Sequence, residues 1–177
     1  MTEQLKIAGV QLRGHTQVTK EEFDRGVRNR LHIGVEVQNA ASAPLHVWSS
    51  RRYYDYDSST QTLSVHLAEP TADPPPNIKL ISDHPRVPTQ TLVGAGAHVT
   101  IEVLVPTTIR RRAPAKGLGM SFVEEPIEEI ARVELLVQHA DVPFQRVIGE
   151  TPRKLRQRLR QHGHVVSATL TPVSKEQ

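Results

Sequence analysis

The stretch that decides the fold is Leu31-His32-Ile33-Gly34-Val35-Glu36-Val37-Gln38. Large apolar residues occupy every second position, and the residues between them are polar or small. Successive side chains of an extended strand point to opposite faces, so this alternation is typical of a β-strand. We therefore predict a strand over residues 31–38, with one face buried and one face toward solvent.

The same alternation recurs up to residue 142, in runs rich in Val, Ile, Leu and Thr. Turn-forming residues separate the runs, for example at 39–44 and 57–60. A change of phase at Ala8-Gly9 indicates a β-bulge in the first run. We expect seven short strands: the tyrosine-rich stretch before residue 57, and residues 5–12, 31–38, 45–48, 63–67, 99–105 and 132–138.

Consecutive short strands without an intervening helix predict a mainly β protein. We expect an antiparallel, immunoglobulin-like β-sandwich of about seven strands, with a small open barrel as the alternative. The likeness is one of architecture, because the sequence lacks the Cys…Trp…Cys spacing of immunoglobulin domains. Residues 69–76 and 110–119 contain few apolar residues and are predicted to be loops.

The end of the chain has the features of a helix and not of a strand. Thr151 suits the N-cap, Pro152 the first helical position and Gly163 the residue after the end. These signals predict a C-terminal α-helix over residues 152–162. A final strand is expected over residues 164–170.

The predicted helix has a narrow apolar stripe formed by Leu155 and Leu159, which Ile148 is expected to extend. The stripe predicts that the helix packs on the preceding β region. We accordingly divide the chain into a β-sandwich domain, residues 1–145, and a basic helix plus strand extension, residues 146–177, that packs on the same domain.

The positive charge is concentrated in this extension. Residues 146–177 carry seven Lys or Arg against two Asp or Glu, whereas residues 1–145 carry 15 against 17. Such a local field indicates where an acidic protein or another polyanion, including nucleic acid, would bind. The interpretation that we favour for this helix alone is an ordinary solvated face, because charged runs usually are. Anionic lipid belongs to the same class of partner, but two leucines make too thin an apolar face for a membrane-surface helix. The candidate contact residues are Arg153, Lys154, Arg156 and Arg160.

A second candidate region is aromatic. Trp48, Tyr53, Tyr54 and Tyr56 fall within nine residues of one another. We expect Trp48 in the core, and we take Arg52, Tyr53 and Tyr54 as candidate partner-binding residues, because Tyr and Arg are enriched in interface hot spots.

Two charged runs follow in the middle of the chain, Arg110-Arg111-Arg112 and the glutamates at 124, 125, 128 and 129. We expect them to offset each other on the surface, where each exposed ion pair contributes about 0–1 kcal/mol.

Several chemistries lack support. The chain has no cysteine, and most of its nine histidines fall singly. The only close pairings, His162 with His164 and His139 with Asp141, are too few ligands for zinc, so we predict no metal site. No nucleophile or dinucleotide motif is complete, and we predict no cofactor and no catalytic residues. The sequence shows no membrane span and no secretory signal, and we expect a cytoplasmic location.

These observations favour a non-catalytic interaction or accessory module that binds another macromolecule, most simply a protein. The first alternative is polyanion or nucleic-acid binding through the basic helix. A weaker alternative is a small-molecule binder or an enzyme whose site is assembled from scattered residues.

Overall fold

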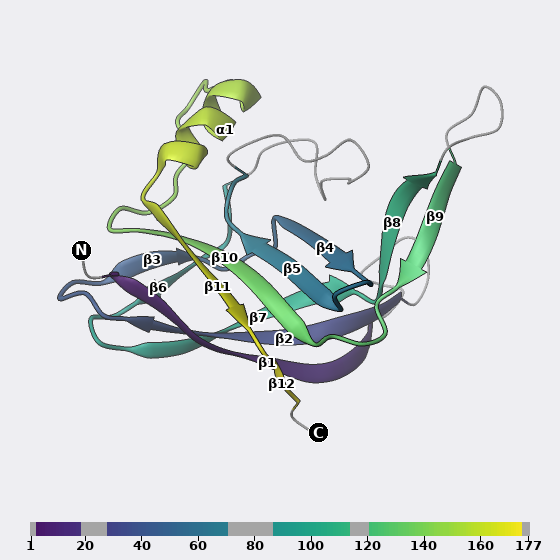
Figure 1. Ribbon diagram of the computed structural model, residues 1–177. Coiled ribbons are helices and arrows are strands. Elements are labelled where there is room, and N and C mark those ends of the chain that lie inside the picture. The colour runs from purple at the N-terminus through teal and green to yellow at the C-terminus, as the bar shows by residue number, and fades with distance from the viewer. Residues whose placement is uncertain (1–2, 19–27, 71–86, 114–120, 175–177) are drawn as a thin grey trace.

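The computed structural model describes residues 3–18, 28–70, 87–113 and 121–174. These residues form a mainly β structure with one α-helix (Figure 1). All the strands that we predicted are present, but the described part contains twelve. Those that the sequence did not predict are β6 (Gln90–Val93), β8 (Thr108–Ala113), β9 (Ser121–Pro126) and β12 (Val173–Ser174).

The first sheet has four strands in the order β12-β1-β2-β7, where β1 is Leu5–Val18, β2 is Arg28–Asn39 and β7 is His98–Pro106. The stretch 31–38 lies in β2, at the centre of the sheet, and pairs antiparallel with both β1 and β7. Its four apolar side chains are at most 5% exposed, which confirms the predicted half-buried strand.

The register of β1 against β2 shifts between Ile7 and Gly9, as the change of phase in the sequence predicted. A side-chain Cβ at Gly9 would lie 2.7 Å from the Glu36 carboxylate on the neighbouring strand. Glycine at this position therefore leaves room for Glu36.

The second sheet has the order β4-β5-β10-β3-β6, and β11 also pairs with β10. Besides β6, this sheet contains β3 (Leu45–Trp48), β4 (Tyr53–Asp57), β5 (Thr62–Leu67), β10 (Arg132–Ala140) and β11 (His164–Leu170).

The prediction of antiparallel pairing throughout is wrong, because both sheets are mixed. β5 pairs parallel with β10, and β1 pairs parallel with β12. An antiparallel pair closes with a short turn, whereas the chain visits β6, β7, β8 and β9 between β5 and β10. Local alternation reveals a strand but not the direction of its neighbour.

The predicted loop over residues 110–119 is also wrong where the structure describes it. Residues 108–113 and 121–126 pair as an antiparallel ribbon, which extends away from the two larger sheets (Figure 1). The arginine run has no apolar alternation, so its strand depends on pairing with β9. We call β8 and β9 together the arm.

The two larger sheets form two layers that face each other (Figure 1), and their inward residues belong to one hydrophobic cluster. Leu5 and Ile33 come from the first sheet, and Leu63 and Leu135 from the second; none of them is exposed. Trp48 is 1% exposed, which confirms its predicted burial. The Phe144 ring packs edge-on against Trp48, with 5.5 Å between the ring centroids.

The helix α1 spans Pro152–Gln161 and begins as predicted, because the Thr151 side chain caps the backbone N–H of Lys154. Leu155 and Leu159 are buried in the same cluster as the sheets. Ile148 does not extend this stripe, since it is fully exposed. The division of the chain into residues 1–145 and 146–177 stays a prediction.

Candidate interaction surfaces

The tyrosine strand β4 supports the base of the arm. The Tyr54 hydroxyl donates to the carbonyl oxygen of Thr108 at 3.1 Å. Arg111 reaches back from β8 to Asp55 at 3.2 Å and donates to the carbonyl oxygen of Tyr56. The base of the arm is therefore fixed to β4 by several polar contacts.

Within the arm, Arg111 also pairs with Glu125 of β9 at 2.9 Å. The hydrogen bond from Arg111 lowers the pKa of Glu125. The expected offset between the arginine run and the acidic run is thus present for this pair. This ion pair orders the ribbon, and it means that the contacts of Arg111 are intramolecular.

The outer part of the arm exposes apolar and aromatic surface. Phe122 is 41% exposed and Val123 is 55% exposed. The guanidinium group of Arg110 stacks on the Phe122 ring, 4.8 Å from its centroid. Ile109 and Ile127, in contrast, are buried where the ribbon joins the body. The arm is anchored at its base and exposed beyond it.

Tyr53 lies in the same strand and is half-buried. Its ring centroid is 4.7 Å from that of His66 on β5. Burial and the nearby Asp55 carboxylate raise the pKa of Tyr53 to about 12. Tyr53 is therefore neutral at physiological pH, as an ordinary tyrosine is, and it keeps its proton into more alkaline solution as well.

Arg52, a predicted contact residue, is buried in the structure at 8% exposure. Its Nε donates to the Glu69 carboxylate at 3.1 Å, and Arg156 of α1 lies 3.6 Å from the other oxygen of Glu69. Gln138 accepts from the backbone N–H of Glu69 and donates to the carbonyl oxygens of Leu159 and His162. These contacts fasten the helix to the sheet, and we call them the Glu69 latch.

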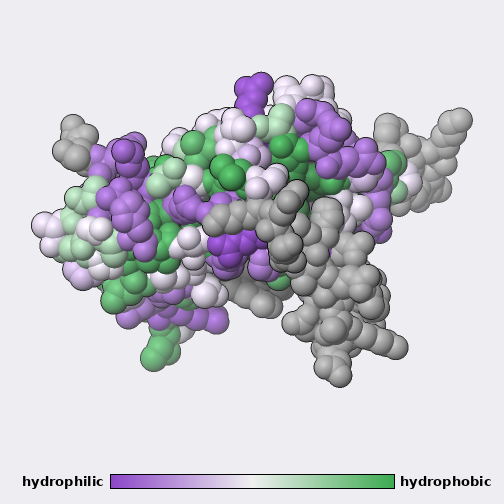
Figure 2. All heavy atoms as spheres, turned by 90° about the horizontal axis from the view of Figure 1, so that it is seen from below, coloured by the Kyte–Doolittle hydropathy of each residue, from purple (hydrophilic) through white to green (hydrophobic). Residues whose placement is uncertain are grey.

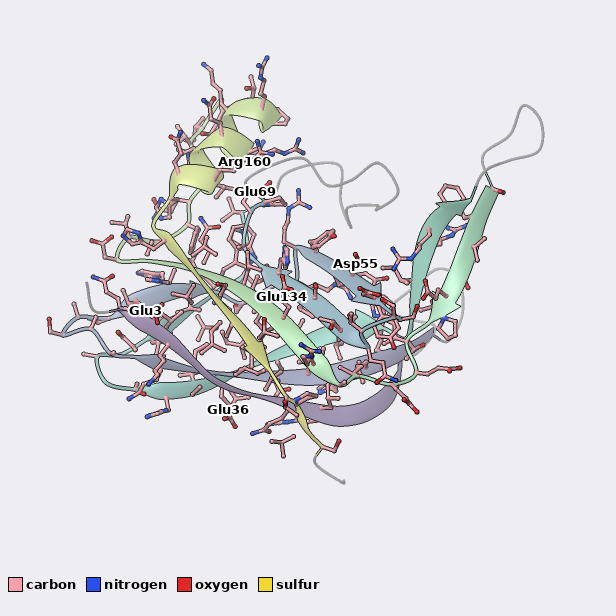
Figure 3. All side chains as sticks on the ribbon, in the orientation of Figure 1. Glu3, Glu36, Asp55, Glu69, Glu134 and Arg160 are labelled. Carbon is pink, nitrogen blue, oxygen red and sulfur yellow. The ribbon has the colours of Figure 1, made fainter. Side chains whose placement is uncertain are left out.

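The helix cations divide into two groups. Arg156 and Arg160 are half-buried, lie one turn apart on one helix face, and have their Nε atoms shielded from solvent. Figure 3 shows Arg160 on the helix above Glu69. Arg153 and Lys154 are exposed. Of the four predicted helix contacts, the structure thus leaves the first two fully open to a partner.

The turn before α1 carries a feature that the sequence did not reveal. Ile148 has a relative exposure of 101% and Val147 one of 54%. Arg146, Arg153 and Lys154 are exposed around them in the chain. We call these five residues the helix-tip surface. The sequence signal for this surface was the apolar pair Val147 and Ile148 directly before Gly149. The same pair also fitted an extension of the apolar helix stripe.

The outer face of the four-stranded sheet is mostly polar and has internal ion pairs, although Leu104 of β7 is 41% exposed on it. Arg13 contacts Glu102 at 2.6 Å, and Gln11 donates to Glu36. Figure 2 shows the molecule from below, with hydrophilic and hydrophobic residues interspersed. We find no candidate site on this face of the described residues.

The described residues contain no group of three or more His, Asp or Glu side chains placed to hold a metal ion. In the same part of the chain, no helix has the length and apolar character needed to cross a membrane.

No protein-family model matches this chain, and neither a curated protein nor a solved structure shows significant similarity to it. Support for a function therefore comes from the arm and the helix alone.

Proposed function

We propose that this protein is a non-catalytic interaction module that binds a protein partner through the arm and the adjoining strand β4. The contact residues in this proposal are Tyr53, Tyr54, Arg110, Phe122 and Val123. Arg52, which the sequence suggested as a contact, acts indirectly by holding Glu69. The observation that carries the proposal is the exposed, braced arm.

An isolated two-stranded ribbon is marginally stable in water, and an open strand edge offers unpaired backbone groups to another chain. Natural proteins usually shorten, charge or cover such an edge. The strands of the arm are charged in this way, but the arm also carries an exposed Phe stacked with an Arg. Aromatic and Arg side chains dominate interface hot spots. Because polar contacts order its base, a partner would meet a largely preformed surface.

The two-layer arrangement supports a β-sandwich. The immunoglobulin-like variant of that class stays a proposal, and the parallel pairing of β5 with β10 weighs against it, because immunoglobulin sheets are antiparallel. A cytoplasmic location is likewise proposed.

The test places a photo-crosslinking amino acid at position 123 of the full chain, expressed in its native cells. We expect a discrete protein adduct that the substitution Phe122→Ser abolishes. Position 173, an exposed valine on β12 of the four-stranded sheet, provides the matched control. The proposal fails if position 123 gives no adduct beyond that control, or if Phe122→Ser leaves the adduct unchanged.

The alternative is polyanion binding through Arg153, Lys154, Arg156 and Arg160. Its support is the exposure of the first two, while the contact between Arg156 and Glu69 weakens it. Binding of duplex DNA would fall steeply between low and moderate salt and would be lost in the double variant Arg153→Glu, Lys154→Glu. A small-molecule or enzymatic role stays a weaker proposal, with no site assigned.

A further inference from the structure

The most exposed large apolar side chain that the structure describes is Ile148, at a relative exposure of 101%. A value of this size means that the side chain projects from the surface and packs against nothing. Val147 beside it is also exposed, at 54%. Single exposed apolar residues are common on proteins, but a projecting adjacent pair on one turn needs an explanation.

This turn is held in place by its neighbours. The backbone N–H of Glu150 donates to the carbonyl oxygen of Val147 at 3.1 Å, and Gly149 supplies a positive φ of 77°. Arg158 binds the Glu150 carboxylate at 2.7 Å and donates to the carbonyl oxygen of Gln145. The helix therefore braces the turn with the two apolar side chains outward.

Cations surround the apolar pair along the chain. Arg146 precedes it, and Arg153 and Lys154 follow in the first turn of α1, which contains no acidic residue. Cations in the first turn oppose the helix dipole, so they reduce helix stability where they stand. The nearby Glu150 is already paired with Arg158. Glu150 also interacts with the charge of Arg146, so the helix-tip surface combines two projecting apolar side chains with three cations near a single acid.

The surface also lies at an end of the molecule. The start of α1 and the turn before it are far from the four-stranded sheet (Figure 1), and nitrogen-tipped side chains project outward there (Figure 3).

We propose that the helix-tip surface binds the anionic surface of a lipid bilayer, with Val147 and Ile148 entering the headgroup region and Arg146, Arg153 and Lys154 contacting acidic headgroups. This inference is independent of the proposed protein binding by the arm. Apolar side chains gain by leaving water at such an interface, and each adjacent cation is attracted to anionic lipid. Nucleic acid fits less well, because no aromatic side chain accompanies these cations and the apolar pair would remain in water.

The experiment is flotation of the full chain with vesicles of phosphatidylcholine alone and with vesicles in which roughly one lipid in three is phosphatidylserine. We expect binding to the anionic vesicles only. The variant Ile148→Ser should weaken it about tenfold or more. The double variant Arg153→Gln, Lys154→Gln should also weaken it at least about tenfold, since each cation contributes about fivefold.

Matched controls change the same residue types elsewhere on the exposed surface. Val173→Ser removes a 62% exposed apolar side chain from β12, and the double variant Lys6→Gln, Arg132→Gln removes two exposed cations. Both controls should bind anionic vesicles within about twofold of the unaltered chain. All the substituted positions are exposed, so the variants should fold, and circular dichroism checks this.

Three results would overturn the inference. The first is equal or absent binding to both kinds of vesicle. The second is binding that the two controls weaken as much as the helix-tip variants, which indicates a general effect of net charge. The third is vesicle binding that Ile148→Ser leaves unchanged and that duplex DNA competes away. That result would assign the helix-tip surface to nucleic acid. None of these results bears on crosslinking at the arm.

Discussion

At the scale of single residues, Glu69 is the one buried carboxylate among the described residues. Its side chain is 1% exposed and lies between Arg52, which is also buried, and Arg156 of the helix. A buried ion pair is a weak source of net stability, because desolvation offsets the attraction. Removing one partner is nevertheless costly, since the other charge stays buried without compensation.

The substitution Glu69→Gln should therefore lower the free energy of unfolding by about 3–5 kcal/mol. Guanidinium denaturation followed by tryptophan fluorescence of Trp48 measures this. Glu102→Gln, which breaks the half-exposed pair with Arg13, is the control and should cost about 0–1 kcal/mol. Equal costs for the two variants would contradict a latch at Glu69.

His139 is the second residue with a measurable consequence. It is 2% exposed, and burial together with the nearby His164 lowers its pKa below the ordinary value of 6.5. The folded protein therefore disfavours the proton that the unfolded chain takes up. Stability is fully present above about pH 6.5 and declines as the pH falls through that value toward the lowered pKa.

We expect the thermal midpoint to fall between about pH 7.5 and about pH 5.5, and to fall less in the variant His139→Gln. Burial lowers the pKa of His66 in the same direction, so His66→Gln should remove part of the remaining dependence. Differential scanning calorimetry at both pH values provides the data. A pH dependence that neither substitution alters would show that other groups are responsible.

At the scale of elements, the junction between α1 and β11 depends on Gly163. This residue has a φ of 72°, and a Cβ placed there would lie 2.0 Å from the carbonyl oxygen of His139. β11 can therefore begin its pairing with β10 only if this position has no side chain. The sequence predicted Gly163 as a helix terminator, and the packing adds this second reason.

Gly163→Ala should consequently destabilise the protein by well over the cost of the backbone conformation alone, which is about 1–2 kcal/mol. Gly96 also has a φ of 72°, but a Cβ placed there would have nothing within 4 Å, so Gly96→Ala isolates that conformational cost. Chemical denaturation compares the two variants. If they are equally destabilised, the close approach to His139 has no energetic weight.

At the scale of the whole molecule, two layers hold one core while the arm and the helix tip lie outside it (Figure 1). β2 and β10 are each paired on both sides, whereas in the described residues β8 and β9 pair only with each other. Strands with pairing on both edges and buried faces open only in rare, large fluctuations.

Amide hydrogen exchange followed by mass spectrometry should then show the strongest protection in β2 and β10. Arm amides should exchange faster by orders of magnitude in the isolated protein, because local opening of the ribbon exposes little buried surface. Addition of a true arm partner would slow exchange in the arm selectively. Protection of the arm equal to that of β2 would mean that it is no separate unit.

The sequence alone predicted much of the fold, because the alternation at 31–38 and the cap at Thr151 act over a few residues. It also located the basic helix and the tyrosine strand. It did not predict β8, because the arginines of this strand do not alternate with apolar residues. It also did not predict that Ile148 is exposed, because an isoleucine at this position fitted the apolar helix stripe equally well.

What the sequence determined by itself is therefore the set of local preferences: the strands with apolar alternation, the start of the helix, and the alternating apolar side chains that enter the core. Only the tertiary structure decided the parallel pairing of β5 with β10 and the meeting of Glu69 with Arg52 and Arg156. The tertiary structure likewise decided which cations of the helix are exposed to a partner. The physical reason is that these contacts join residues far apart in the chain, and no local pattern specifies which distant residue will supply the opposite charge or the next strand.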